Sequence, residues 1–226
     1  MKKKIRTLLI TGALLGQGGI VLAEVDPEEV DGTTHTSTVT TEIIPGDDIT
    51  DPSPGPETPI EPPDTNPGTD RYGIRYVSNL DFGQMKFSTR DETIKTQYDA
   101  TLKSASGPIN SYVHIRDIRA ASERGGWHVT VQQDSEFIPG SSLTFSPSFS
   151  DNSEGFSEDD FTIPTTLEIS KDPITFMSTV TAENPAGTAA LVEMGEAELH
   201  VPANSGTGSY KTNLIWNLVA GPDETL

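Results

Sequence analysis

The segment "YKTNLIWNLVAGP", residues 210 to 222, alternates side chains with period two and contains Trp216, the second of two tryptophans. On a β-strand, residues i and i+2 share a face. One face therefore carries Tyr210, Thr212, Leu214, Trp216 and Leu218. The other face carries a mixed set, namely Lys211, Asn213, Ile215, Asn217 and Val219. The pattern predicts a half-buried strand that cannot be removed without removing core residues.

The first tryptophan stands in a similar setting, "GGWHVTV", residues 125 to 131. Here Trp127, Val129 and Val131 share a face, while His128 and Thr130 point the other way. Each Trp-x-aliphatic unit forms an apolar ridge, and an indole buries a large area when packed. We interpret both tryptophans as mainly core. The alternative is that one indole lies at a sheet edge as a platform for a sugar ring.

The rest of the chain from residue 71 consists of short alternating runs bounded by Gly, Pro, Asn and Ser. They are "IRYVS", "QMKFS", "SYVHIRD", "WHVTVQQ", "SLTFS", "TTLEIS", "ITFMSTV", "AELHV" and "TNLIWNLV". Many short strands separated by turns indicate an all-β fold, either an antiparallel β-sandwich or an open barrel-like sheet pair. The polar stretch 146 to 160 is predicted to be a surface loop.

The first 70 residues have a different composition. Residues 1 to 23 combine a basic start, an apolar run and a small residue at Ala23, which is typical of a cleaved export signal. Residues 24 to 70 hold 13 acids, no Lys or Arg, and eight prolines between Pro45 and Pro67, so we expect a disordered acidic tether. Within it, "TTHTSTVTTEII" is interpreted as a solvated tail in preference to a docking strand. The β domain is assigned to residues 71 to 226.

Charge and cysteine content limit the possible partners. After loss of the signal, 11 basic residues remain against 34 acidic ones, a formal net charge of −23. Such a surface repels nucleic acid and anionic membranes, so neither nucleic acid nor direct membrane insertion is expected. The absence of cysteine excludes disulfides, a lipid-bearing Cys and thiolate metal sites. The C-terminal sequence "NLVAGPDETL" shows no sorting motif, so attachment to a cell would have to be non-covalent.

No catalytic or metal-binding constellation stands out, and we expect no enzyme activity, metal or cofactor. There is no G-x-S-x-G nucleophile motif, and the histidines have unrelated spacings: His35, His114, His128 and His200. We interpret them as structural. In the acidic loop, an irregular calcium site remains an alternative to a solvated loop, formed by Asp151, Glu154, Asp159 and Asp160.

Three arginines precede the first tryptophan within nine residues: Arg116, Arg119 and Arg124. Guanidinium groups suit carboxylates, such as those of peptidoglycan stem peptides. A carboxylate-binding clamp is one interpretation. The other, which we favour, is a solvated loop whose charge is offset by Asp117 and Glu123.

The segments "IRYVSNLDFG" (residues 74 to 83), "SYVHIRDIRAASERGGWHVTV" (residues 111 to 131) and "LHVPANSGTGSYKTNLIWNLVAGP" (residues 199 to 222) together resemble the WxL-domain surface proteins of Gram-positive bacteria. The first tryptophan motif departs from the pattern, with Val129 in place of Leu. The resemblance implies that the motif residues Trp127, Val129, Tyr210, Trp216 and Leu218 serve wall or partner binding.

The resemblance further implies a secreted protein held non-covalently on the cell wall, with peptidoglycan as receptor. Its implied partners are other WxL surface proteins, a membrane-anchored protein and, in some assemblies, host matrix proteins. Two competing functions stay open. The domain could dock on a partner protein that itself contacts the wall, or it could be a peptidoglycan-modifying enzyme, which we consider the weaker alternative.

Overall fold

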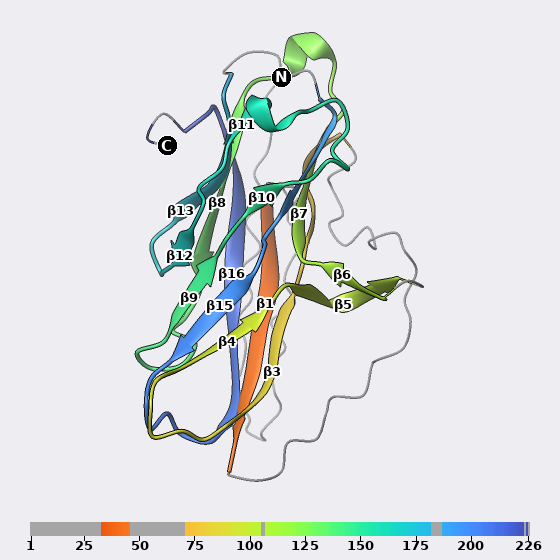
Figure 1. Ribbon diagram of the computed structural model, residues 1–226. Helices are drawn as coiled ribbons and strands as arrows, with labels where there is room; N and C mark the ends of the chain where they lie inside the picture. Colours follow the sequence, from red (N-terminus) through yellow and green to blue (C-terminus); the bar gives the residue numbers. More distant parts are fainter. Residues whose placement is uncertain (1–32, 46–70, 105–106, 182–186, 224, 226) are drawn as a thin grey trace, which may run out of the picture.

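The computed structural model describes residues 33–45, 71–104, 107–181, 187–223 and 225. The predicted signal (residues 1 to 23) and most of the predicted tether lie outside these residues. The described part forms sixteen strands and two 3-10 helices, and its strands are arranged as two layers (Figure 1). Among the described residues, no helix is long and apolar enough to cross a membrane. The predicted all-β sandwich is confirmed.

One layer is a six-stranded sheet in the order β11-β13-β8-β16-β1-β3. Its strands are β1 (Thr34–Ile44), β3 (Leu80–Lys86), β8 (Trp127–Gln133), β11 (Phe161–Thr162), β13 (Ile174–Thr179) and β16 (Gly208–Ala220). The neighbours are antiparallel except for β1 and β3, which run parallel. The two strands with tryptophan, β8 and β16, are adjacent and lie in the interior of this sheet.

The other layer is divided into two four-stranded sheets. The first has the order β10-β14-β7-β2 and the second β12-β9-β15-β4. The first contains β2 (Tyr72–Val77), β7 (Tyr112–Asp117), β10 (Ser148–Phe149) and β14 (Ala189–Glu193). The second contains β4 (Glu92–Thr96), β9 (Ser142–Phe145), β12 (Leu167–Ile169) and β15 (Ala197–Val201). A separate ribbon of β5 (Tyr98–Ser104) and β6 (Gly107–Asn110) projects beside the sandwich (Figure 1).

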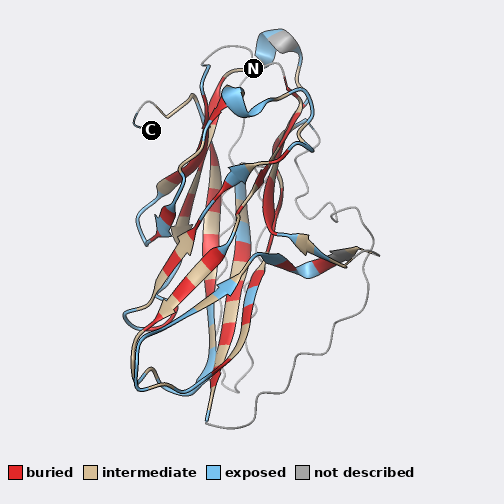
Figure 2. Ribbon diagram, viewed as in Figure 1, coloured by how far each residue is buried: buried red, intermediate tan, exposed pale blue. Residues whose placement is uncertain are grey.

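The core lies between the layers and follows the predicted alternation. Along β8 and β16, buried residues alternate with half-buried ones, which gives the banded strands of Figure 2. Every second side chain points inward, and apart from Thr212 the buried positions of these two strands are apolar. The largest fully buried side chains include Trp127, Trp216, Phe145 and Phe176.

Residues 34 to 44 do not form the solvated tail that their composition suggested. They form β1, which pairs with β16 on one side and with β3 on the other. Val39 and Ile43 are buried in the core together with the hydroxyl residues Ser37 and Thr41. The sequence interpretation failed because this strand has few apolar residues. Its inward hydroxyls are instead satisfied by hydrogen bonds, such as that from Thr41 Oγ1 to the Gly83 carbonyl oxygen at 2.9 Å.

The stretch 146 to 160 is less loop-like than predicted. It contains β10, a bridge between Glu154 and Ala189, and the short helix η2 (Glu158–Asp160). Its aromatic residues Phe149 and Phe156 pack against the core. The second 3-10 helix, η1 (Ala121–Glu123), precedes β8.

Candidate functional site

Trp216 joins the two layers at the centre of the sandwich. Its ring stacks on Phe145 of β9, with centroids 6.4 Å apart, and meets the edge of Phe176 of β13 at 5.1 Å. The indole Nε1 donates a hydrogen bond to Ser37 Oγ of β1 at 2.9 Å. Every face of this indole, including its polar edge, is therefore occupied by the protein.

Trp127 lies at the start of β8 and is covered by a different part of the chain. Its ring lies 5.7 Å from that of Phe161 in β11 and forms a T-shaped pair with Phe156, with centroids 6.3 Å apart, so these two aromatic residues form a lid over it. Its main-chain N–H donates to Thr179 Oγ1 at 3.0 Å. Its indole Nε1 is buried and has no hydrogen-bond partner among the described residues.

Both indoles are shielded from solvent, since Trp127 is 1% exposed and Trp216 is 0% exposed. Val129 and Leu218 are buried as well. Neither tryptophan offers a face on which a sugar could stack in this structure, which rules against the exposed-platform interpretation. Tyr210 differs, because it is half-buried on the core-facing side of β16 and its hydroxyl donates to the Gly206 carbonyl oxygen at 2.7 Å.

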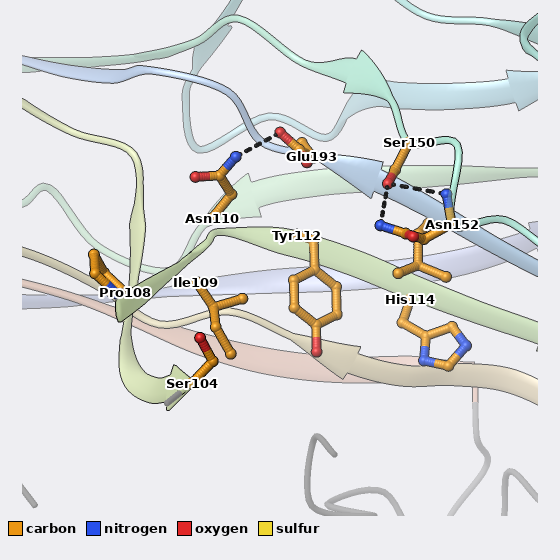
Figure 3. A pocket seen from close by; sticks show the side chains of 10 residues that line it. Ser104, Pro108, Ile109, Asn110, Tyr112, His114, Ser150, Asn152 and Glu193 are labelled. Atoms are coloured by element: carbon orange, nitrogen blue, oxygen red, sulfur yellow. Dashed lines mark hydrogen bonds between the residues drawn. The ribbon is translucent and has the colours of Figure 1, made fainter. Parts of the chain in front are cut away.

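An open groove of about 610 Å³ lies on the outer face of the sheet that contains β7 and β14, where the β5–β6 ribbon leaves the sandwich (Figure 3). Its apolar floor is formed by Tyr112, Ile109 and Leu191. Polar side chains surround that floor: Ser104, Asn110, His114, Ser150, Asn152 and Glu193. Across the groove, Asn110 Nδ2 donates to Glu193 Oε2 at 3.0 Å.

A buried polar network fixes the floor of this groove. Tyr112 packs against Tyr76 with ring centroids 5.3 Å apart. The Tyr76 hydroxyl donates to Asp99 Oδ2 at 2.5 Å, and Asp99 Oδ1 accepts main-chain N–H bonds from Thr101 and Leu102 at 2.6 and 2.8 Å. Burial, together with the nearby Asp99 carboxylate, raises the pKa of both Tyr76 and Tyr112 far above the usual range. Both phenols therefore stay neutral and hold the ribbon to the sheet.

A second open groove, of about 490 Å³, lies over β1, β3 and β16. Its lining is more polar and includes Thr40, Glu42, Asp81, Gln84 and Lys211. Gln84 Nε2 donates to Glu42 Oε2 at 2.7 Å, an amide–carboxylate pair like that of the first groove. This second groove provides an internal comparison for any binding assay of the first.

A family model described as "WxL domain surface cell wall-binding" matches residues 30 to 222. The chain belongs to the WxL family. The match begins just before β1, so it includes the strand that composition had assigned to a tail. No curated protein and no solved structure matches the chain. The WxL assignment places the protein at the cell surface with a wall-binding role, and the description names binding rather than a reaction.

The three arginines of the predicted clamp have separate environments in the WxL domain. Arg119 forms a two-point ion pair with the buried Asp117, with Nε to Oδ1 at 2.8 Å and Nη2 to Oδ2 at 2.7 Å. Its guanidinium also lies 3.8 Å from the centre of the Tyr72 ring. The hydrogen bonds to Asp117 raise the pKa of Arg119 further. Arg119 is thus held by the buried Asp117, in place of the solvated position that the sequence interpretation assigned to it.

Arg124 is occupied by main-chain oxygens, with Nε donating to Arg119 O at 2.9 Å and Nη1 to Gly187 O at 3.1 Å. Glu123, which was expected to offset this charge, instead pairs with Arg71, whose Nη2 lies 3.2 Å from Glu123 Oε2. Arg116 stands two residues after His114 on β7, so the two residues share a face of the strand, and His114 lines the groove. The structure therefore does not bring the three arginines together as one clamp, and Arg116 shares only a strand face with the groove residue His114.

The histidines and the acidic residues of the loop 151 to 160 are the candidate metal ligands of the chain. Among the described residues, no group of three or more His, Asp or Glu is placed to hold a metal ion. Glu154 accepts from the Thr188 hydroxyl at 3.3 Å, and Asp160 accepts from the Ser157 main-chain N–H at 2.7 Å. His128 Nδ1 lies 2.7 Å from the Gly221 carbonyl oxygen. His35 Nδ1 is buried and has no hydrogen-bond partner in the part of the chain that the structure describes, and burial lowers the pKa of His35.

Sequence reasoning missed the groove. Its residues come from four separate stretches, and pairing of β7 with β14 brings Tyr112 opposite Glu193. The available signal was the alternation in "SYVHIRD", where Tyr112 and His114 share the face opposite Val113 and Ile115. That alternation identifies an outer face with an aromatic residue on it, but not the strands that complete the groove.

Proposed function

We propose that the WxL domain is exported and binds peptidoglycan non-covalently through the groove between β7, β14 and the β5–β6 ribbon. The observation that carries this proposal is the lining of the groove, in which an apolar floor at Tyr112 is surrounded by amide, hydroxyl and carboxylate groups. Sites for sugars and peptides combine apolar contact area with a few placed polar groups in this way. The proposal rests on the family's wall-binding role and assigns that role to a surface.

The chemistry of the groove suits an amino sugar with a short peptide. Asn110 and Asn152 can exchange hydrogen bonds with N-acetyl groups and hydroxyls, and Glu193 accepts from hydroxyl or ammonium donors. Arg116, on the same face, is positioned to meet a stem-peptide carboxylate. Of the three predicted clamp residues, it is the one that this proposal retains.

Attraction at long range cannot drive the binding. The mature chain carries a formal charge of −23, and the wall's anionic polymers repel it beyond contact distance. Binding must therefore depend on short contacts. Retention on isolated walls should increase as the pH falls from 8 toward the sequence pI of about 4.4, because carboxylates lose their charge. Tighter retention at pH 8 than at pH 5 would contradict this.

The deciding experiment is co-sedimentation of residues 24 to 226 with purified peptidoglycan free of protein. The chain must include β1, because residues 71 to 226 alone lack a strand of the main sheet. The groove variant combines Asn110→Ala with Glu193→Gln, and its matched control combines Gln84→Ala with Glu42→Gln in the second groove. We expect the bound fraction to fall several-fold in the first variant and to be unchanged in the second.

A companion pair tests the arginine. Arg116→Gln should weaken sedimentation, whereas Arg90→Gln removes an equal charge from an exposed loop and should not. Circular dichroism and thermal unfolding check that each variant is folded. Equal losses in the groove and control variants would refute the groove as the contact surface.

The rival proposal is attachment through a partner, such as a larger WxL protein or a membrane-anchored protein. It is favoured if the parent chain fails to sediment with pure peptidoglycan but is retained on walls that carry their proteins. A peptidoglycan-modifying activity would appear as release of reducing ends from the same walls, and we expect none.

A further inference from the structure

β1 belongs to the six-stranded sheet but is separated in sequence from all the other described strands. The other described strands all belong to residues 72 to 220, whereas β1 ends at Ile44 and is joined to β2 by residues 45 to 71. It nevertheless lies between β16 and β3, with paired positions from Thr34 opposite Asn217 to Ile43 opposite Gly208. Its other edge pairs with β3 from Leu80 to Lys86.

The space between β16 and β3, here called the slot, has hydrogen-bonding edges and a core gap that only a strand in the place of β1 satisfies. Without β1, the β16 and β3 edges would lose their hydrogen-bond partners, and the Trp216 Nε1 donor would lose Ser37 Oγ. Asn79 Oδ1 would lose the Thr38 main-chain N–H that it binds at 2.7 Å. Val39 and Ile43 would leave a gap in the core. Unpaired edges of this kind recruit any strand of suitable pattern.

The connection from β1 to β2 is long for the distance that it spans. Ile44 lies beside Lys86, and Tyr72 stands 14 residues before Lys86, so at the rise of an extended strand the two ends lie up to about 45 Å apart. The 27 residues from 45 to 71 could reach about 90 Å at full extension. The chain is therefore long enough to place β1 in its own slot or in that of a neighbour.

We propose that β1 is an exchangeable strand, and that residues 34 to 44 of one chain can fill the slot between β16 and β3 of a second copy. Each contact of β1 would be reproduced in the exchanged pair, because the two slots are identical. With the full connection, the chain's own β1 is present at an effective concentration of the order of millimolar. At micromolar concentration the monomer should then dominate, and a shorter connection should favour exchange.

The first test shortens the connection in the otherwise complete chain. Removal of residues 48 to 67 leaves seven residues between β1 and β2, which reach about 25 Å and cannot return β1 to its own slot. At about 50 μM, light scattering should find the parent as a monomer and the shortened chain as a dimer or a larger closed assembly. A shortened chain that is folded and monomeric would overturn the proposal.

The second test uses the absence of native cysteine. Thr40 and Lys211 face each other across β1 and β16. Two chains of different tag size, one with Thr40→Cys and one with Lys211→Cys, are unfolded, mixed and refolded together. Neither can form this disulfide alone, so a heterodimer on a non-reducing gel requires β1 of one chain beside β16 of the other. Its yield should rise with protein concentration and increase in the shortened background.

The matched control is the pair Thr93→Cys and His200→Cys, which face each other across β4 and β15 within the continuous part of the chain. This pair reports collisional oxidation. The proposal is overturned if Thr40→Cys and Lys211→Cys give no more heterodimer than this control. Because the unshortened chains are also tested, the result decides the proposal even if the shortened chain does not fold.

Discussion

The two tryptophans stand in neighbouring strands of one sheet, in similar sequence motifs, and yet they have different environments. Trp216 is held between regular strands of both layers, and its N–H is satisfied by Ser37. Trp127 is covered by Phe156 and Phe161 at the edge of an irregular segment, and its indole N–H is unpaired among the described residues. The repeated motif thus gives one indole a central structural role and the other a covered end position.

Replacing each tryptophan by phenylalanine should give the largest difference between the two sites. Trp216→Phe loses indole volume and leaves Ser37 Oγ without its donor, so we expect a loss of about 2–4 kcal/mol in the free energy of unfolding. Trp127→Phe loses similar volume but also removes an unpaired buried donor, so about 1–2 kcal/mol is expected. Urea unfolding of both variants measures the difference, and equal losses would contradict the assigned environments.

Changes to the aromatic lid over Trp127 should have the next largest effect on stability. Phe156→Ala should cost about 1–2 kcal/mol, less than a fully buried Phe, because Phe156 is half-buried. A Cβ added at Gly187 would meet the Phe156 ring 2.0 Å away, so Gly187→Ala should displace the same lid. Both variants should increase acrylamide quenching of Trp127, measured in chains in which Trp216 is replaced by Phe. Unchanged quenching would show that the lid does not shield this indole.

Ser37→Ala tests the hydrogen bond from the Trp216 indole N–H, which has no counterpart at Trp127 among the described residues. It removes the acceptor of the indole N–H, and we expect a loss of about 1–2 kcal/mol. Ser111→Ala is the control, because Ser111 Oγ is buried and unpaired among the described residues, so its removal should be neutral or stabilising. A double-mutant cycle of Ser37→Ala with Trp216→Phe should show non-additive losses. Full additivity would mean that this hydrogen bond contributes little.

The smallest effect is expected at the C-terminal segment beside Trp127. Asp223 accepts hydrogen bonds from the hydroxyls of Thr175 and Thr225, and these hydrogen bonds lower the pKa of Asp223 to about 2. A lowered pKa contributes stability above the unfolded pKa near 4, and that contribution is lost as the pH falls toward 2. Asp223→Asn should therefore be slightly less stable than the parent at pH 7, with the gap narrowing below pH 4. A constant gap from pH 7 to pH 3 would contradict this.

Much of the sandwich could be read from period-two alternation. The faces of "WHVTVQQ" and "NLIWNLV" were assigned correctly because side-chain direction on a strand is a local property. The groove could not be predicted in the same way, since Asn110 and Glu193 meet through pairing of strands that are far apart in the chain. Of the two acids expected to offset the arginines, Asp117 pairs with Arg119, which is two residues away, whereas Glu123 pairs with Arg71 across the chain.

The sequence by itself determined that the chain folds into an all-β domain, which side of each tryptophan strand faces inward, and that the surface is strongly acidic. These follow from local alternation and from composition. The tertiary structure alone decided that residues 34 to 44 belong to the main sheet, and that the Trp216 indole donates to Ser37 while Trp127 is covered by Phe156 and Phe161. The physical reason is that a strand's pairing partners are set by contacts across the whole chain, so a Thr-rich segment can become core once both of its edges are paired.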